Sequence, residues 1–291
     1  MELSKRHHYI PEFLIKGFVG KDGKVSVYDI KNKRLQSRRK SPKQVFFEWN
    51  RNTFEVHGEK TDFVEGLYQF GENQFAPVYQ NIVKQKGPVD IAEKDIFHLI
   101  YFIGSLYWRV PSNDEKSAKI IKNSTNQDLL FRIQKEDGEE ASQELYDRIM
   151  NEPAFVESSK IILAIRDFLK TDIVSNFENW KLYYADGDVE LHVLGDNPVI
   201  RRNSESANPY ESELIFRLSK GKTVYYTNGK KIKRLSPEHA VSVDVLIFLQ
   251  SEKMVCGPNG DYLNHIALLA DQYRSEDKMT ALKNEIFNVF D

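Results

Sequence analysis

Residues 7–18 read HHYIPEFLIKGF and contain two histidines, one carboxylate, one proline and three aromatic side chains. No other stretch of the chain is as dense in chemically usable groups. Pro11 disfavours helical geometry at Ile10 and itself suits the first turn of a helix. The stretch therefore predicts an extended segment that turns into a short helix, which Gly17 ends.

Composition and charge are those of an ordinary globular protein. Hydrophobic residues make up 41% of the chain and charged residues 29%, and the net charge of -2 provides no global basic field for nucleic acid. The single cysteine, Cys256, excludes an intrachain disulfide and fits a reducing cytosol. The first residues run into histidines instead of an apolar signal sequence, and no apolar run has the roughly 20 residues of a membrane span. We therefore expect a cytoplasmic protein.

The first half of the chain changes from strands to helices. Alternating residues at 24–29 predict a strand that forms a hairpin with a polar strand at 34–40. Helical spacing of apolar residues predicts a helix at 61–83, and the strongly apolar segment 92–108 predicts a central helix. A helical insert, which is a candidate subdomain, is expected at residues 112–175.

From residue 179 the pattern predicts strands. A hairpin is expected at 180–194 around the turn Asp186-Gly187-Asp188. Further strands are expected at 212–218, 223–227 and 242–250, a short helix begins at Ser236, and helices at 259–274 and 277–290 close the chain. The sequence thus predicts one α+β domain over residues 1–291, with N-terminal β-hairpins, a helical middle and an antiparallel C-terminal sheet with closing helices.

The first candidate site combines two histidines and two glutamates. Glu65 and Glu72 are two helical turns apart and share one face, to which His7 and His8 can add ring nitrogens. Such ligands suit Mg²⁺, Mn²⁺ or Zn²⁺, and a metal held there would activate water for phosphodiester cleavage. The alternative is structural: a histidine beside a helix start often bonds backbone groups, and two glutamates also fit a solvated helix face.

Arg109 forms the second candidate site with Asp196 and Asn197. Arg109 follows the apolar helix, so a buried guanidinium would need a carboxylate, which Asp196 can supply. The same guanidinium suits a phosphate or carboxylate of a ligand. A plain turn is the alternative reading of Asp196 and Asn197.

The third candidate is a basic surface with aromatic residues. Residues 219–234 and 31–43 both lack acids, and two tyrosines lie within the first segment. Lysines beside aromatic rings suit phosphate contacts and base stacking, whereas a solvated hairpin is the alternative. The residues that would contact nucleic acid are Lys220, Lys222, Tyr225, Lys230, Lys231 and Arg234.

The chain resembles a widespread family of unknown function that is marked by an N-terminal His-Tyr-x-Pro motif. The matching motifs, in order, are His8-Tyr9-Ile10-Pro11, the strand at 25–29, Glu65 with Glu72, Arg109-Val110-Pro111, Asp196-Asn197-Pro198-Val199 and Leu235-Ser236-Pro237. The resemblance implies one large domain and implies no activity.

The residues favour a metal-dependent hydrolase of nucleic acid, such as a microbial effector or toxin. His8, Glu65, Glu72 and Arg109 would be catalytic, the ion would be Mg²⁺ or Mn²⁺, and Tyr9 would contact the substrate. The alternative is a non-catalytic module that binds nucleic acid or protein, in which the His-Tyr-x-Pro motif is structural. A small-molecule enzyme with Arg109 as an anion clamp is a third hypothesis.

Overall fold

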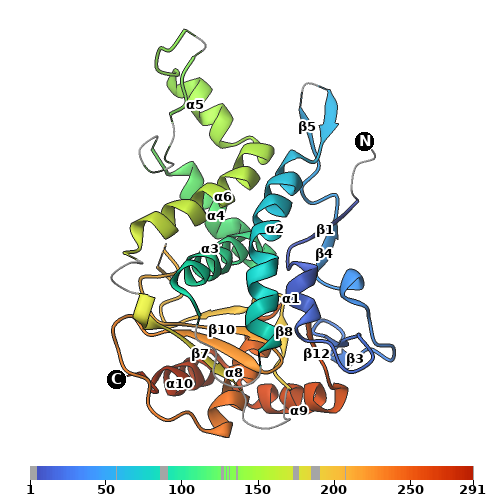
Figure 1. Ribbon diagram of the computed structural model, residues 1–291. Helices are drawn as coiled ribbons and strands as arrows, with labels where there is room; N and C mark the ends of the chain where they lie inside the picture. The colour runs from blue at the N-terminus through green and yellow to red at the C-terminus, as the bar shows by residue number, and fades with distance from the viewer. Residues whose placement is uncertain are drawn as a thin grey trace.

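A computed structural model describes the chain from residue 5 to residue 290, except for residues 57, 86–90, 126–127, 129, 131, 136, 173–176, 185–190 and 207. Strands at the N-terminus lie beside α2, and a sheet with the C-terminal helices lies below the helical layer α2 to α6 (Figure 1). The predicted α+β class is therefore confirmed.

The N-terminal segment forms short strands around one small helix. Its elements are β1 (Arg6–His8), α1 (Glu12–Lys16), β2 (Ser26–Asp29), β3 (Arg34–Leu35), η1 (Pro42–Gln44), β4 (Phe47–Trp49), β5 (Phe54–Val56) and β6 (Glu59–Thr61). Helix α1 begins directly after Pro11 and is capped by Gly17, as the sequence predicts. The polar strand expected at 34–40 is shorter, with only β3 and a bridge between Val25 and Lys40.

The middle of the chain is helical. It contains α2 (Phe63–Lys84), α3 (Glu93–Arg109), η2 (Pro111–Asn113), α4 (Asp114–Lys122), α5 (Gln143–Met150) and α6 (Pro153–Lys170). Pro77 lies inside α2 without ending it. Helix α6 packs against α3. The indole N–H of Trp108 donates to Asp167 at 2.8 Å, and the ring centres of Phe97 and Phe168 lie 6.3 Å apart.

The strands of the second half lie in two four-stranded sheets, one of which also contains β2 and β3 from the N-terminal segment. One has the antiparallel order β7-β11-β10-β9, and the other has the order β3-β2-β12-β8. The elements are η3 (Phe177–Asn179), β7 (Trp180–Tyr184), β8 (Leu194–Gly195), β9 (Val199–Arg201), β10 (Leu214–Ser219), β11 (Lys222–Tyr226), α8 (Pro237–Gln250), β12 (Met254–Gly257), α9 (Gly260–Ala270), η4 (Asp271–Tyr273) and α10 (Glu276–Phe287).

Two predictions for this half are wrong. The hairpin at 180–194 does not form, because β7 pairs with β11 while β8 pairs with β12 in the other sheet; its expected turn lies outside the described residues. The strand at 242–250 is part of helix α8, which begins at Pro237 with the Ser236 hydroxyl accepting the His239 N–H at 3.3 Å. Residues 243–248 are all buried, so the helix lacks the polar face that would have shown a helical period.

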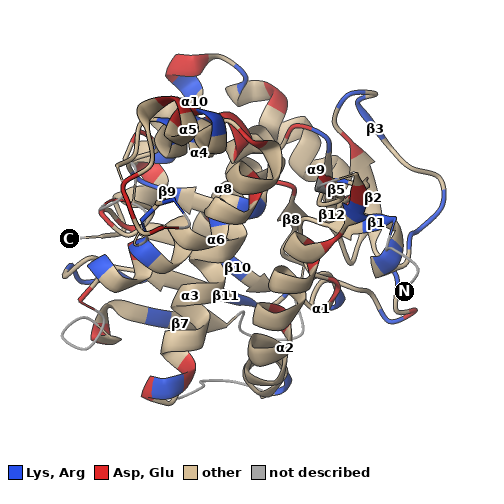
Figure 2. Cartoon of the chain, turned by 90° about the horizontal axis from the view of Figure 1, so that it is seen from above, with Lys and Arg blue, Asp and Glu red and all other residues tan. Residues whose placement is uncertain are grey.

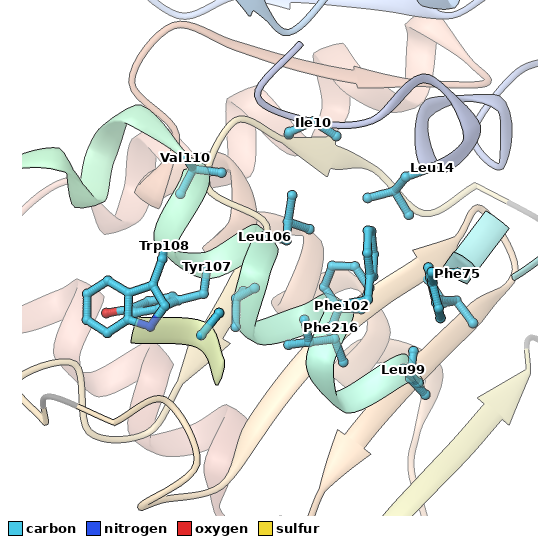
Figure 3. Packing of buried hydrophobic residues seen from close by; sticks show 14 of the residues in the cluster. Ile10, Leu14, Phe75, Leu99, Phe102, Leu106, Tyr107, Trp108, Val110 and Phe216 are labelled. Atoms are coloured by element: carbon cyan, nitrogen blue, oxygen red, sulfur yellow. The ribbon is translucent and has the colours of Figure 1, made fainter. Parts of the chain in front are cut away.

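The N-terminal motif is built into the main core. Ile10 and Leu14 pack over α3, whose Phe102, Leu106 and Trp108 point into the same cluster (Figure 3). The rings of Phe75 and Phe102 stack at 4.2 Å and join α2 to α3. Within the described residues, no helix is both long and apolar enough to cross a membrane.

Candidate functional site at the N-terminal motif

The aromatic half of the motif is structural. Tyr9 is only 1% exposed, and its backbone N–H donates to the Phe46 carbonyl at 3.0 Å. Burial, with nearby Asp196 and Glu48, raises the pKa of the Tyr9 hydroxyl far above its usual value. Tyr9 therefore lies in the core and does not form the exposed substrate contact that was predicted.

The two histidines lie on opposite faces of β1. His7 is fully buried, and its Nδ1 accepts the backbone N–H of Asn52 at 2.8 Å. Asn52 in turn donates its side-chain amide to Glu65 at 2.7 Å. His8 is half-buried on the other face, and its ring centre lies 5.7 Å from that of Phe47. His7 is therefore linked to Glu65 through Asn52, whereas His8 lies on the opposite face of the strand.

Burial lowers the pKa of the His8 ring and favours its neutral form. Burial is the main cause of a lowered pKa, and Arg109 lowers it further, while Glu12 and Glu65 act in the opposite direction. The Nε2 atom of His8 is buried and has no hydrogen-bond partner among the described residues. A neutral imidazole with an unpartnered nitrogen suits proton transfer to or from a ligand.

Arg109 ends α3 and is held between two glutamates of α2. Its Nη1 donates to Glu72, and its Nη2 lies 3.9 Å from the Glu65 carboxylate. The guanidinium carbon lies 4.2 Å from the centre of the Tyr68 ring. Burial opposes the charge, but Glu72 and Glu65 outweigh it and raise the pKa of Arg109. The side chain is therefore a permanent cation, although it is only 3% exposed.

Glu65, Glu72 and Arg109 thus form an arginine–carboxylate cluster, and the charges of Arg109 and Glu65 act on the nearby His8. Within the part of the chain that is described, no group of three or more His, Cys, Asp or Glu side chains is arranged to hold a metal ion. His7 faces away, and Arg109 occupies the space between the glutamates. The predicted ligand set of two histidines and two glutamates is therefore not assembled.

Asp196 has another role than the predicted pairing with Arg109. Its carboxylate accepts the backbone N–H groups of residues 252, 253 and 254 at 3.0, 2.6 and 2.9 Å. The backbone carbonyl of Asn197 accepts a hydrogen bond from the Gln250 side chain. Both residues therefore hold the connection between α8 and β12.

A pocket adjoins the cluster. Arg109, Glu72, Tyr68 and Pro11 line it together with apolar residues of α2, α3 and α6. The Nε and Nη2 atoms of Arg109 have no hydrogen-bond partner among the described residues. Sequence reasoning missed Tyr68, although it lies three residues after Glu65 and four before Glu72, on the same helical face.

The face of the β1–β4 ribbon that carries His8 also carries exposed aromatic and basic groups. Arg6 pairs with Trp49 in the strand register, and His8 pairs with Phe47. The Arg6 guanidinium carbon lies 5.1 and 5.0 Å from the ring centres of Phe47 and Trp49. Because Trp49 is 59% exposed, this ribbon face forms a cation–aromatic surface beside His8 that the sequence analysis missed.

The predicted basic hairpin is not a surface. Every residue of β10 and β11 is buried, including Tyr225, whose ring stacks on His239 with centres 6.0 Å apart. Lys222 donates to the Gln85 carbonyl at 2.6 Å. The prediction of base stacking on Tyr225 is wrong because β7 pairs with one edge of this hairpin, β9 pairs with the other, and helices cover its faces.

The other lysines predicted to contact nucleic acid are distributed around this sheet. Lys220 is half-buried, and its backbone N–H donates to the Gly17 carbonyl at 3.0 Å. Lys230 pairs with Glu213, whereas Lys231 and Arg234 are exposed. The segment that carries them pairs with the C-terminus, which lies on the opposite side of the molecule from β3 in both views (Figures 1 and 2). The two basic segments therefore do not share one surface.

Comparison with known proteins identifies one family. Residues 6–257 match the family described as Protein of unknown function (DUF4238). Neither a curated protein nor a solved structure matches the chain. The match includes the N-terminal motif, the helices that form the arginine–carboxylate cluster, and both four-stranded sheets. The chain therefore belongs to the family Protein of unknown function (DUF4238).

Proposed function

We propose that the protein is a hydrolase that cleaves phosphodiester bonds in single-stranded nucleic acid at the cluster around His8 and Arg109. The supporting observation is that, among the described residues, His8 Nε2 and the Nε and Nη2 atoms of Arg109 have no hydrogen-bond partner, with the Glu65 carboxylate 3.9 Å from Nη2. An unsatisfied buried polar group costs about 1–3 kcal/mol. Oxygen atoms of a bound phosphodiester would remove that cost.

The two residues have complementary roles in this reaction. Arg109 binds the non-bridging phosphate oxygens and offsets the charge that builds up on them. His8, which its lowered pKa keeps neutral at pH 7, accepts the proton of the attacking water. The water oxygen bonds to phosphorus, the bond to the leaving oxygen breaks, and the leaving oxygen takes a proton from the His8 imidazolium.

The ribbon face supports nucleic acid as the substrate. Trp49 is exposed, is flanked by the Arg6 guanidinium, and lies on the same face as His8. An aromatic ring beside a cation stacks a base and attracts the backbone phosphate without requiring a particular sequence. We infer that a single strand lies along this face and places one phosphodiester at His8.

The proposal extends to the role of the His-Tyr-x-Pro motif and to the cellular compartment of the protein. We infer that His8-Tyr9-Ile10-Pro11 is the element with which members of the family build this site, because Tyr9 and Ile10 anchor it in the core while His8 faces the cluster. We also infer a cytoplasmic protein, which the single, buried Cys256 supports.

A cleavage assay on a fluorescently labelled single-stranded RNA and DNA tests the proposal. We expect His8→Gln and Arg109→Lys to lower kcat by about 100-fold or more, as for loss of acid–base or oxyanion-stabilising groups. His98→Gln is the matched control, because His98 is exposed on α3 and contacts only the Lys94 carbonyl among the described residues. Circular dichroism and the Tm show whether each variant is folded.

The outcomes separate the mechanisms. Activity that persists in EDTA supports acid–base catalysis by His8. Activity that is lost in EDTA and restored by Mg²⁺ or Mn²⁺ overturns this role of His8 in favour of a metal-dependent hydrolase. A folded wild-type protein that cleaves neither strand refutes the proposal.

A non-catalytic binding module is the second candidate, and the burial of Tyr9 and Ile10 in the core favours it. In that case the ribbon face binds a strand that is not cleaved. Binding to phosphates weakens steeply as salt rises, whereas binding of a protein through an apolar surface responds little. Binding of the labelled strand without cleavage, measured over a range of salt concentrations, would identify this function.

A further inference from the structure

A second cavity lies away from the His8 cluster, between α4, β9, α8 and α10. Three cationic side chains line it, each from a different element: Lys116 from α4, Arg201 from β9 and Lys283 from α10. Its volume is about 350 Å³, within the range of small-molecule sites. The remaining lining includes the polar residues Asn197, Ser204, Gln250 and Thr280.

Neutral oxygen atoms of Ser204 and Ser206 hold the three cations together. Arg201 donates to the carbonyls of Ser204 and Ser206 at 2.6 and 3.0 Å. Lys116 donates to the same two carbonyls at 2.7 and 2.8 Å. The Nζ atom of Lys283 lies 3.4 Å from the Ser204 hydroxyl. The loop at 204–206 therefore positions the cations without neutralising them.

Acidic groups act on the three cations from beyond the distance of an ion pair. Within the described residues, none of Lys116, Arg201 and Lys283 has a carboxylate oxygen within the 4.0 Å of an ion pair. Glu276 lines the cavity, the exposed Glu205 acts on all three cations at longer range, and Asp167 and Glu211 act on Arg201. The Arg201 guanidinium is instead stacked on the Tyr107 ring, with its carbon 4.4 Å from the ring centre.

Burial of the three cations, together with repulsion of both lysines by Arg201, makes this arrangement costly without a ligand. Burial and the charge of Arg201 lower the pKa of Lys116 to about 8. The same two causes lower the pKa of Lys283, and burial lowers that of Arg201. A bound dianion would reverse the repulsion, because each cation would then gain an opposite charge at short range.

We propose that this cavity binds a phosphomonoester group, either as inorganic phosphate or as the phosphate of a nucleotide. A phosphomonoester presents up to two negative charges and three strong acceptor oxygens, which matches three converging cations. A guanidinium that is already stacked and fixed binds such oxygens without losing further side-chain freedom. This proposal is independent of the one for His8, since the two cavities share no lining residue.

Calorimetric titration of the full chain tests the site. The ligands are inorganic phosphate, adenosine 5′-monophosphate and adenosine, each at constant ionic strength maintained with sodium chloride. Saturable binding of phosphate and of the nucleotide, without binding of adenosine, supports a phosphate site. Tighter binding of the nucleotide than of phosphate identifies a nucleotide as the ligand. Saturation by neither phosphate nor the nucleotide refutes the proposal.

Charge-removing variants locate the bound group. We expect Lys283→Met to weaken binding roughly 10- to 150-fold, the loss of one hydrogen bond to a charged group. Lys119→Met is the matched control, because Lys119 is an exposed lysine of α4 outside the cavity, and it should leave the affinity unchanged. Equal affinity of the two variants would overturn the site. Because Lys283 is not fully buried, the variant should remain folded, which its Tm in the absence of ligand checks.

Discussion

The guanidinium carbon of Arg109 lies 4.2 Å from the centre of the Tyr68 ring, which joins the last residue of α3 to the first half of α2. The ring covers one face of the guanidinium, while Glu72 accepts a hydrogen bond from one end of it. Among the described residues the Nε and Nη2 atoms have no hydrogen-bond partner, although the Glu65 carboxylate lies 3.9 Å from Nη2. Arg109 is therefore both a structural cation for α2 and the group with most remaining hydrogen-bonding capacity in the cluster.

Loss of Arg109 should destabilise the protein through the carboxylates that it leaves behind. We expect Arg109→Met to lower the free energy of unfolding by about 3–5 kcal/mol, because Glu65 becomes a buried charge without a cation. The double variant Arg109→Met/Glu65→Gln should recover a large part of this loss. Urea denaturation of the three proteins measures the difference. Equal stabilities of the single and double variants would contradict this explanation.

Gly17 should be intolerant of any side chain, although its backbone is in an ordinary helical conformation. A Cβ atom there would lie 1.9 Å from the Tyr79 hydroxyl, which is held 3.3 Å from the Leu14 carbonyl and 3.0 Å from that of Leu218. We expect Gly17→Ala to cost about 1–3 kcal/mol of stability through overpacking. Chemical denaturation measures it.

Gly66 provides the control for that substitution. It lies inside α2, and a Cβ atom there would have no atom within 4 Å. Gly66→Ala should therefore stabilise the protein by about 0.5–1 kcal/mol, the difference in helix propensity. Removal of the hydroxyl in Tyr79→Phe should reduce the cost of Gly17→Ala, and an unchanged cost would rule out the steric cause.

Trp49 should contribute to binding of single strands and little to stability. The side chain is 59% exposed, so Trp49→Ala removes a stacking platform without opening the core. We expect the affinity for a labelled single strand to fall by about 1–3 kcal/mol, the contribution of one stacked base. Fluorescence anisotropy measures it, with Phe63→Ala as a control that removes an equally exposed aromatic ring from α2. The same loss in both variants would argue against a site on the ribbon face.

Acid should destabilise the protein partly through buried histidines. Burial, aided by Arg217, lowers the pKa of His239 to about 4, and burial also lowers the pKa values of His192 and His8. The unfolded chain therefore takes up protons near pH 6.5 while the folded chain does not. This contribution to stability is complete above that pH and is lost as the pH falls towards about 4.

The variant His239→Gln tests this pH dependence. The variant lacks the contribution of His239 to the pH dependence of stability. As the pH falls from 7 to about 4.5, its free energy of unfolding should therefore decrease less than that of the wild type. The exposed His98→Gln should follow the wild type. Denaturation curves over this pH range are the measurement, and a His239→Gln profile parallel to the wild type would show that His239 is not responsible.

Some of the site was predictable and some was not. Glu65 and Glu72 are seven residues apart in a well-marked helix, so their shared face follows from local periodicity alone. That Arg109 lies between them, 37 residues beyond Glu72, depends on how α3 packs against α2. The amino-acid pattern therefore identified the residues of the cluster, while their chemistry, an ion-pair cluster instead of a metal site, depended on packing.

The wrong predictions have a related cause. The apolar segment 92–108 was long enough to be recognised as a helix, whereas residues 242–250 were too short a window and were read as a strand. The two tyrosines of β11 and the lysines in and around it predicted an exposed basic hairpin, but both neighbouring strand positions are filled and the faces are covered. Whether a strand is exposed to solvent depends on the strands and helices that pack around it and not on its own residues.

The sequence by itself determined the α+β class and the order of most elements. It also determined the start of α1 after Pro11, the end of α1 at Gly17 and the helix cap at Ser236. These features depend on residues that are a few positions apart in the chain. Only the tertiary structure decided which side chains are buried, which carboxylates pair with Arg109, and that Lys116, Arg201 and Lys283 converge. The physical reason is that burial, desolvation and Coulomb energy depend on distances between segments that are remote in the chain.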